Sequence, residues 1–272
     1  MLHVLKLGAE KGSGYMDKNV VRQMVCVLSV LGTIGGNALA NILPFNGQST
    51  GAVSNKFDVL FTPAGYVFGI WGLLYLTWIV FAVFQFLPSQ KQNPRLAHVT
   101  YLFSVSGLIN VLWLLLWHYE YFALTVLAML VLLGLLIACY LRLDIGRARV
   151  SFIERCCVDV PFSLYLAWIS VATIANVTIF LRHVGWSGWG LPESVWASVM
   201  IAVATGLGVI ACAQRRDLAF VAVLAWAFVG IADKQAATPT VVTAAWLATG
   251  VLGLATLGRL VYDVRRRQGA AI

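Results

Sequence analysis

The chain has 272 residues, of which 60% are hydrophobic and only 11% are charged. Soluble globular proteins carry about 25% charged residues, so this composition excludes an ordinary soluble domain and predicts an integral membrane protein. The net charge of +8 is typical of basic cytoplasmic loops between membrane spans, and it gives no reason to expect a nucleic-acid partner.

The N-terminal segment, residues 1–19, is mostly polar, and we expect it to form a cytoplasmic tail. The apolar run that follows is longer than the hydrophobic region of a signal peptide, so we expect no cleavage after Ala38-Leu39-Ala40. The five cysteines form no Cys-x-x-Cys pair and have no histidine partners at ligand spacing. The sequence therefore predicts no metal site, and no catalytic residue stands out.

Eight uncharged segments with apolar centres are candidates to cross the roughly 30 Å hydrocarbon core of a bilayer. They predict an all-α fold with transmembrane helices at residues 21–43, 66–87, 98–117, 121–141, 160–181, 194–213, 217–232 and 240–262. The seventh segment is short, because its uncharged part rises only about 22 Å. It must tilt little, let Arg216 reach the interface, or re-enter the same side.

The placement of basic residues supports eight spans with both termini in the cytoplasm. In this arrangement 16 of the 19 Lys and Arg residues fall on the inner side, and only Lys56, Arg182 and Lys234 fall outside. Such an asymmetry is the positive-inside pattern of membrane proteins. Three loops are long: an outer loop at 44–64, a basic inner loop at 142–159, and a Gly- and Trp-rich linker at 183–193.

Three predicted helices carry polar and aromatic side chains at intervals of three and four residues, which places each set on one helix face. The sets are Phe68, Trp71, Tyr75 and Trp78; Asn110, Trp113 and Trp117; and Tyr165, Trp168, Ala172 and Asn176. An asparagine inside a span faces other helices or a cavity rather than lipid. The deeper members lie too far from the helix ends for an interfacial belt. We favour a lined cavity over ordinary helix packing, because pockets are mostly apolar and aromatic with a few placed polar groups.

The first predicted helix carries small residues at intervals of four, Gly32, Gly36 and Ala40. Small residues at this spacing let two helix backbones approach closely, so we expect a packing face here. The same property makes a homodimer through such faces a reasonable expectation.

Three segments of the chain resemble the TspO/MBR family of tryptophan-rich sensory and translocator proteins. Residues 61–75, FTPAGYVFGIWGLLY, follow the proline-rich turn and aromatic entry of the family's second helix. Residues 110–113, NVLW, are similar to its Asn-x-x-Trp motif, and residues 168–176, WISVATIAN, to its Trp-x-x-Phe-Ala-x-x-Leu-Asn motif. The chain departs from the family at Ala64, Tyr66 and Ile70, where the family has Pro, Trp and Pro.

The resemblance covers residues 20–182 and implies a five-helix bundle with a pocket closed by the loop between its first two helices. It implies a tetrapyrrole such as protoporphyrin, a sterol or a drug-like molecule as ligand. Some relatives are linked to porphyrin breakdown that involves the Trp pair matching Trp71 and Trp168. Carried over by position, the ligand-binding residues would be Phe68, Trp71, Tyr75, Asn110, Trp113, Trp168, Ala172 and Asn176.

Beyond this unit we expect a three-helix membrane extension at 183–264 and a basic cytoplasmic tail at 265–272. The favoured function is a membrane-embedded binding, translocator or sensory protein for a flat hydrophobic ligand. The alternatives are a transporter or scaffold for another small hydrophobic molecule and, less favoured, a porphyrin-degrading enzyme. No cofactor is firmly implied, although a porphyrin or haem-type tetrapyrrole is a candidate ligand. The expected location is a bacterial cytoplasmic membrane, with the lipid bilayer as the second partner.

Overall fold

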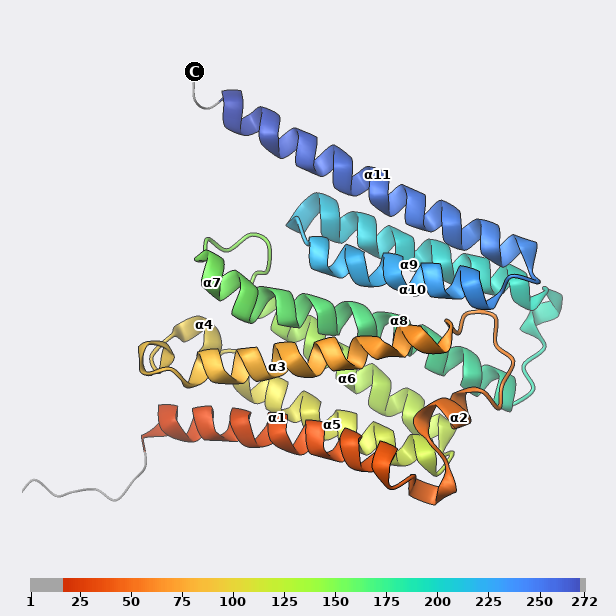
Figure 1. The fold of residues 1–272 in the computed structure, drawn as a ribbon, viewed down its shortest axis with the longest axis horizontal. Helices are drawn as coiled ribbons and strands as arrows, with labels where there is room; N and C mark the ends of the chain where they lie inside the picture. Colours follow the sequence, from red (N-terminus) through yellow and green to blue (C-terminus); the bar gives the residue numbers. More distant parts are fainter. Residues whose placement is uncertain (1–16, 270–272) are drawn as a thin grey trace, which may run out of the picture.

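The computed structural model describes residues 17–269, which contain helices and no strand. Eight long helices run back and forth along one bundle (Figure 1). They are α1 (Lys18–Ile42), α3 (Ile70–Phe86), α5 (Thr100–His118), α6 (Phe122–Arg142), α8 (Val160–His183), α9 (Glu193–Arg215), α10 (Leu218–Lys234) and α11 (Pro239–Gly269). Three short helices lie in the connections: α2 (Thr50–Ser54), α4 (Pro94–Ala97) and α7 (Phe152–Glu154).

The long helices form two adjoining groups. In the first group, α1 packs against α3 and α5, α5 packs against α6, and α8 packs against both α6 and α3. In the second group, α9, α10 and α11 pack against one another, and α10 lies against α8. The helix α8 is therefore the element that both groups share, and its residues line one cavity in each direction.

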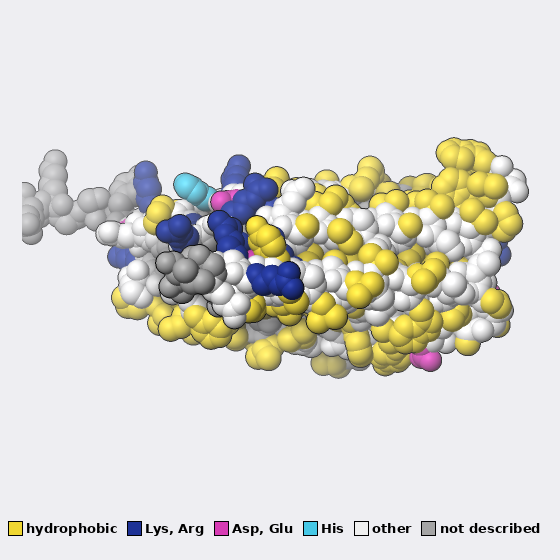
Figure 2. All heavy atoms as spheres, turned by 90° about the horizontal axis from the view of Figure 1, so that it is seen from above, with side chains coloured by type: hydrophobic (Ala, Val, Ile, Leu, Met, Phe, Trp, Pro, Cys, Tyr) yellow, Lys and Arg dark blue, Asp and Glu magenta, His cyan; other side chains and the backbone are white. Residues whose placement is uncertain are grey.

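Seven of the helical segments are long and apolar enough to cross a membrane, and α10 is shorter, with 17 residues. Large hydrophobic side chains such as Ile42, Leu108 and Leu254 point outward, as a lipid-facing surface requires. On the face in Figure 2, lysine and arginine side chains gather towards one end of the molecule, and hydrophobic side chains are prominent over the rest. The protein is therefore an all-α integral membrane protein.

The helix α1 begins and α11 ends at the same end of the bundle (Figure 1). This is the arrangement expected when an even number of long helices alternate in direction. That all eight cross the bilayer, and that this end faces the cytoplasm, remain predictions.

Three helix boundaries differ from the sequence-based expectations. The helix expected from residue 66 begins as an α-helix only at Ile70, because Gly65–Gly69 form a 3₁₀ helix. The helix containing α8 begins earlier than expected, because α7 and a π-helical turn, Arg155–Asp159, precede it directly. Arg95 makes this possible by pairing with Glu154 and Asp159, so that two carboxylates can enter the helical segment. The basic inner loop is correspondingly shorter than residues 142–159.

The helix α11 also differs, since it continues past residue 262 to Gly269. Residues 265–269, expected in a tail, therefore continue the helix. An ion pair one turn apart, between Arg259 and Asp263 at 3.1 Å, supports the helical conformation in this region. The rest of the expected tail lies outside the described residues.

Glycines bring α1 and α5 close together, but only part of the expected small-residue face takes part. A Cβ atom on Gly36 would lie 3.2 Å from a methyl group of Val111, and one on Gly107 would lie 2.4 Å from Thr33 Oγ1. Gly32 has open space around it. The close approach therefore involves Gly36 of α1 and Gly107 of α5.

The helices α1 and α3 diverge along their length (Figure 1). Near the basic end, Gln23 and Gln85 hold them together, since each side-chain amide donates to the other residue's carbonyl oxygen, at 2.6 and 3.1 Å. Towards the other end the helices separate beneath the loop that joins them. This separation creates the space for the larger of the two cavities in the first helix group.

Candidate functional site

A small cavity, which we call the inner cavity, lies in the middle of the first helix group between α3, α5, α6 and α8. Its volume is about 60 Å³. Seven of the eight predicted ligand-binding residues line it: Phe68, Trp71, Asn110, Trp113, Trp168, Ala172 and Asn176. The structure thus brings together side chains from three helices that the sequence singled out separately.

A larger cavity of about 500 Å³, the outer cavity, adjoins the inner one where α1 and α3 separate. Tyr75, the eighth predicted residue, lines the outer cavity and not the inner one. Phe68, Trp71 and Trp113 line both, so these rings form the wall between the two spaces. The amide side chains Asn37 and Asn41 face the outer cavity from α1.

Aromatic rings close the inner cavity, some packed edge-to-face and one pair stacked. The ring of Trp168 packs edge-to-face against Phe68, at a centroid distance of 5.7 Å, and against Trp71, at 6.2 Å. The interplanar angles are 89° and 86°. Trp113 and Trp117 stack on α5 at 5.4 Å with an angle of 24°. Such pairs contribute about 0.5–1.5 kcal/mol beyond the burial of their area. The Trp71–Trp168 contact therefore joins α3 to α8 as well as lining the site.

Five buried polar atoms that have no hydrogen-bond partner among the described residues belong to side chains lining the inner cavity. They are Thr62 Oγ1, Asn110 Nδ2, Trp113 Nε1, Trp168 Nε1 and Asn176 Oδ1. Leaving one such group unpaired costs about 1–3 kcal/mol. Five unsatisfied donors and acceptors therefore face a single cavity.

Asn110 and Asn176 are each held in place by a hydrogen bond at one atom of the side-chain amide. Asn110 Oδ1 accepts a hydrogen bond from Asn37 Nδ2 at 2.9 Å, and Asn176 Nδ2 donates to Thr125 Oγ1 at 3.0 Å. Asn110 Nδ2 lies near the Tyr165 hydroxyl but does not meet it with hydrogen-bond geometry. Each amide consequently keeps one fixed atom and one free atom, which suits the recognition of a ligand.

The loop between α1 and α3 covers the cavities, as the sequence led us to expect for residues 44–64. It contains a 3₁₀ turn, Phe45–Gly47, and the short helix α2. Trp117 Nε1 donates to the carbonyl oxygen of Thr50 at 3.1 Å, and Gln48 Nε2 donates to that of His118 at 2.9 Å. At its exposed edge Lys56 pairs with Glu120, and the hydrogen bond from Lys56 is the main cause that lowers the pKa of that carboxyl.

The second helix group holds the last part of this loop and the entry to α3. Four hydrogen bonds join them: Leu60 N–H to Glu193 Oε1 (3.0 Å), Ala64 N–H to the Gly230 carbonyl (2.9 Å), Trp226 Nε1 to the Val67 carbonyl (3.3 Å) and Gln235 Nε2 to the Val59 carbonyl (3.4 Å). The segment 59–67 includes Pro63, which lines both cavities. The C-terminal helices therefore fix part of the site although only one of their side chains lines it.

That side chain is Lys234, which lines the outer cavity from the end of α10. Its ammonium group and the Tyr75 phenol are the ionisable groups among the residues lining the two cavities. The sequence reasoning assigned Lys234 no role, because nothing local links the end of a seventh helix to a loop about 170 residues earlier. It also overlooked Met129 and Thr62, which carry no marker of an inward face.

These features define a class: a multi-pass helical membrane protein whose five-helix unit encloses a capped, tryptophan-lined cavity. The chain belongs to the TSPO-like protein family, whose sequence profile matches residues 23–258. The match continues beyond residue 182, through α9 and α10 and into α11. No curated protein and no solved structure gives a significant match.

Proposed function

We propose that this protein binds a flat hydrophobic ligand with an acidic edge, a porphyrin-like tetrapyrrole, as a membrane translocator or sensor. The observation that carries the proposal is the convergence of four tryptophan rings and five buried polar atoms without a partner among the described residues on one capped cavity. Flat aromatic walls suit a macrocycle, and pockets of this kind combine apolar walls with a few placed polar groups.

The two cavity volumes suggest where the ligand lies. The inner cavity, about 60 Å³, is too small for a macrocycle, whereas the outer cavity, about 500 Å³, is in the range of ligand pockets. We infer that the ring occupies the outer cavity against Trp71 and Trp113 and turns one polar edge towards the inner cavity. Trp71 must then move relative to Trp168 as the ligand enters.

Lys234 favours a tetrapyrrole over a sterol. It brings a positive charge to the lining of the outer cavity, and no Asp or Glu lines either cavity. It makes no ion pair with a described residue of the chain. A carboxylate on the ligand would pair with this ammonium group, whereas a sterol has no charge to offer.

The test is a titration of the purified protein with protoporphyrin IX, followed by tryptophan quenching and porphyrin absorption. We expect saturable binding that Trp168→Phe weakens roughly tenfold, because the change removes one buried donor worth about 1–1.5 kcal/mol. Trp71→Phe should weaken binding by a similar factor through lost ring contact. Trp246→Phe, which alters a lipid-facing ring on α11, is the matched control and should leave affinity unchanged.

A second pair of titrations tests the charge. Lys234→Gln should weaken binding of protoporphyrin IX but not of its dimethyl ester, which lacks the carboxylates. Absence of saturable binding to the parent protein would contradict the proposal. An unchanged porphyrin spectrum under illumination would separate binding from porphyrin breakdown.

A further inference from the structure

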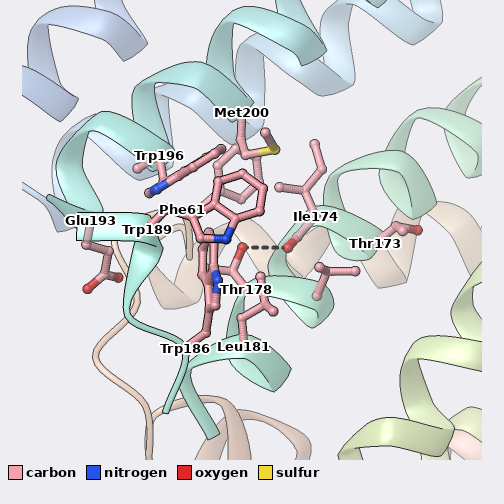
Figure 3. A pocket seen from close by; sticks show the side chains of 12 residues that line it. Phe61, Thr173, Ile174, Thr178, Leu181, Trp186, Trp189, Glu193, Trp196 and Met200 are labelled. Carbon is pink, nitrogen blue, oxygen red and sulfur yellow. Dashed lines mark hydrogen bonds between the residues drawn. The ribbon is translucent and has the colours of Figure 1, made fainter. Parts of the chain in front are cut away.

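A second cavity of about 500 Å³ lies on the other face of α8, outside the five-helix unit (Figure 3). Thr173, Ile174, Val177, Thr178 and Leu181 line it from α8, whereas the inner cavity uses Trp168, Ala172 and Asn176 of the same helix. The remaining walls come from Phe61 in the loop between α1 and α3, from the linker after α8 and from the first turns of α9. We call this space the α8–α9 pocket.

Three tryptophan rings form one end of the α8–α9 pocket. Trp186, Trp189 and Trp196 lie at mutual centroid distances of 5.3–5.5 Å, with interplanar angles from 55° to 80°. Trp196 Nε1 donates to the Gly188 carbonyl at 2.9 Å, which fixes that ring against the linker. The result is a set of differently oriented ring faces around the same space.

Trp189 is held in an unfavourable backbone conformation. Its φ is +53°, between Gly188 at +67° and Gly190 at +79°, and a bulky L-residue rarely adopts this region. The side chain is 78% exposed, so packing of the protein core does not account for the conformation. Residues with backbone strain of this kind cluster at binding and active sites, so the conformation is consistent with a binding role for this ring.

Glu193 is the ionisable group among the residues that line the pocket, and no Lys or Arg joins it there. It lies at the edge of the pocket, beside the tryptophan cluster (Figure 3). One carboxylate oxygen accepts a hydrogen bond from the Leu60 amide at 3.0 Å, and no described Lys or Arg forms an ion pair with it. Its negative charge is therefore not neutralised by a neighbouring cation.

We propose that the α8–α9 pocket binds a lipophilic cation, an ammonium group carried on an apolar body. The faces of tryptophan rings attract ammonium groups, most strongly where water is excluded, and Glu193 supplies the opposite charge. The aliphatic side chains Ile174, Leu181 and Met200 take the apolar body. A free cation fits better than a phosphocholine headgroup, because no basic side chain lines the pocket to pair with a phosphate.

The test compares two probes of the same shape, benzyltrimethylammonium and its uncharged carbon isostere neopentylbenzene. Each is titrated calorimetrically into the full chain in an uncharged maltoside detergent. We expect the cation to bind at least tenfold more tightly than the isostere. Glu193→Gln should remove most of that difference, while the variant keeps the oxygen that accepts the Leu60 amide.

Two further variants locate the binding. Trp189→Leu should weaken the cation severalfold and Trp189→Phe should restore part of the loss, since a phenyl face also attracts cations. Trp168→Phe, in the inner cavity, should leave cation binding unchanged. This independence keeps a failure here distinct from a failure of the porphyrin proposal.

The proposal is overturned if the cation does not bind saturably, or if it binds no better than neopentylbenzene. It is also overturned if Glu193→Gln weakens both probes equally, which would mark a structural role. A third titration uses short-chain dihexanoyl-phosphatidylcholine below its micellar concentration. If it binds more tightly than benzyltrimethylammonium, the site recognises a lipid headgroup and the free-cation assignment is wrong.

Discussion

The two helix groups treat their buried polar atoms differently. All nine buried side-chain polar atoms that lack a partner among the described residues belong to the first group and its loop, and none belongs to the described part of residues 183–269. In α9, at the residue that caps α10 and in the turn after α10, the buried polar residues Thr205, Asp217 and Gln235 all make hydrogen bonds. The buried side-chain polar atoms without a partner therefore lie in the first group, whereas the buried polar atoms described in the second group are paired.

The difference shows what each group contributes. Asp217 accepts hydrogen bonds from Tyr140 and Ser163 at 2.9 and 2.7 Å, so the second group uses its buried polarity to hold the first. An unpaired buried group lowers stability, so five such groups around one cavity need an explanation, and the proposed ligand would supply their partners. We interpret the first group as the binding unit and the second as its support.

The largest expected effect comes from separating the two groups. In Gly230→Ala the new Cβ would lie 2.1 Å from a methyl group of Val67, so α10 must shift away from the entry to α3. Overpacking of this kind costs about 1–3 kcal/mol. We expect a lower thermal midpoint in detergent and weaker porphyrin binding, because residues 63–65 line the outer cavity.

Gly250→Ala is the matched control, because Gly250 is also helical but has no atom within 4 Å of the added carbon. It should leave both measurements unchanged or raise the midpoint slightly. Equal effects of the two substitutions would contradict the view that the second group supports the site through Gly230.

An intermediate effect is expected from removing one unpaired atom of the first group. Asn176→Leu replaces the amide by an apolar side chain of similar size. It removes the unpaired Oδ1 together with the hydrogen bond to Thr125, whose hydroxyl still donates to the Phe122 carbonyl, so the thermal midpoint of the unliganded protein should change little. Porphyrin affinity should fall roughly tenfold. A loss of stability with unchanged affinity would show that Asn176 is a structural residue.

The smallest effect concerns the edge of the loop, where Lys56 lowers the pKa of Glu120 in the folded state. The pair stabilises the fold above the ordinary pKa of a glutamate, and that contribution is lost as pH falls through the lowered value. Both side chains are well exposed, so the effect should stay below about 1 kcal/mol. Wild type should be slightly more stable than Glu120→Gln at pH 7, and the difference in thermal midpoint should shrink as pH falls below the ordinary pKa of a glutamate, about 4.3.

Helical periodicity explains why much of the binding unit could be predicted. Asn110 and Trp113, or Trp168 and Asn176, reach the same cavity because intervals of three and four residues repeat one helix face. Tyr75 lies on the same helix as Trp71, but it lines the outer cavity alone, whereas Trp71 lines both cavities. Pattern identifies a helix face, whereas the angle between two helices depends on all of their contacts.

The supporting contacts were beyond prediction for a different reason. Ala64 and Gly230, or Val67 and Trp226, meet across more than 150 residues of chain, and nothing in their local sequence marks either partner. The same holds for Glu193, whose place beside Leu60 follows from the path of the linker after α8.

The amino-acid sequence by itself determined that this protein is a helical membrane protein with a tryptophan-rich inward face. A chain so poor in charge must satisfy its backbone hydrogen bonds inside lipid, and helices do so locally. Only the tertiary structure decided which polar atoms stay unpaired, how the rings of Trp71 and Trp168 meet, and which helices hold the loop. These features depend on distances between segments remote in the chain, which are set by the packing of the whole bundle.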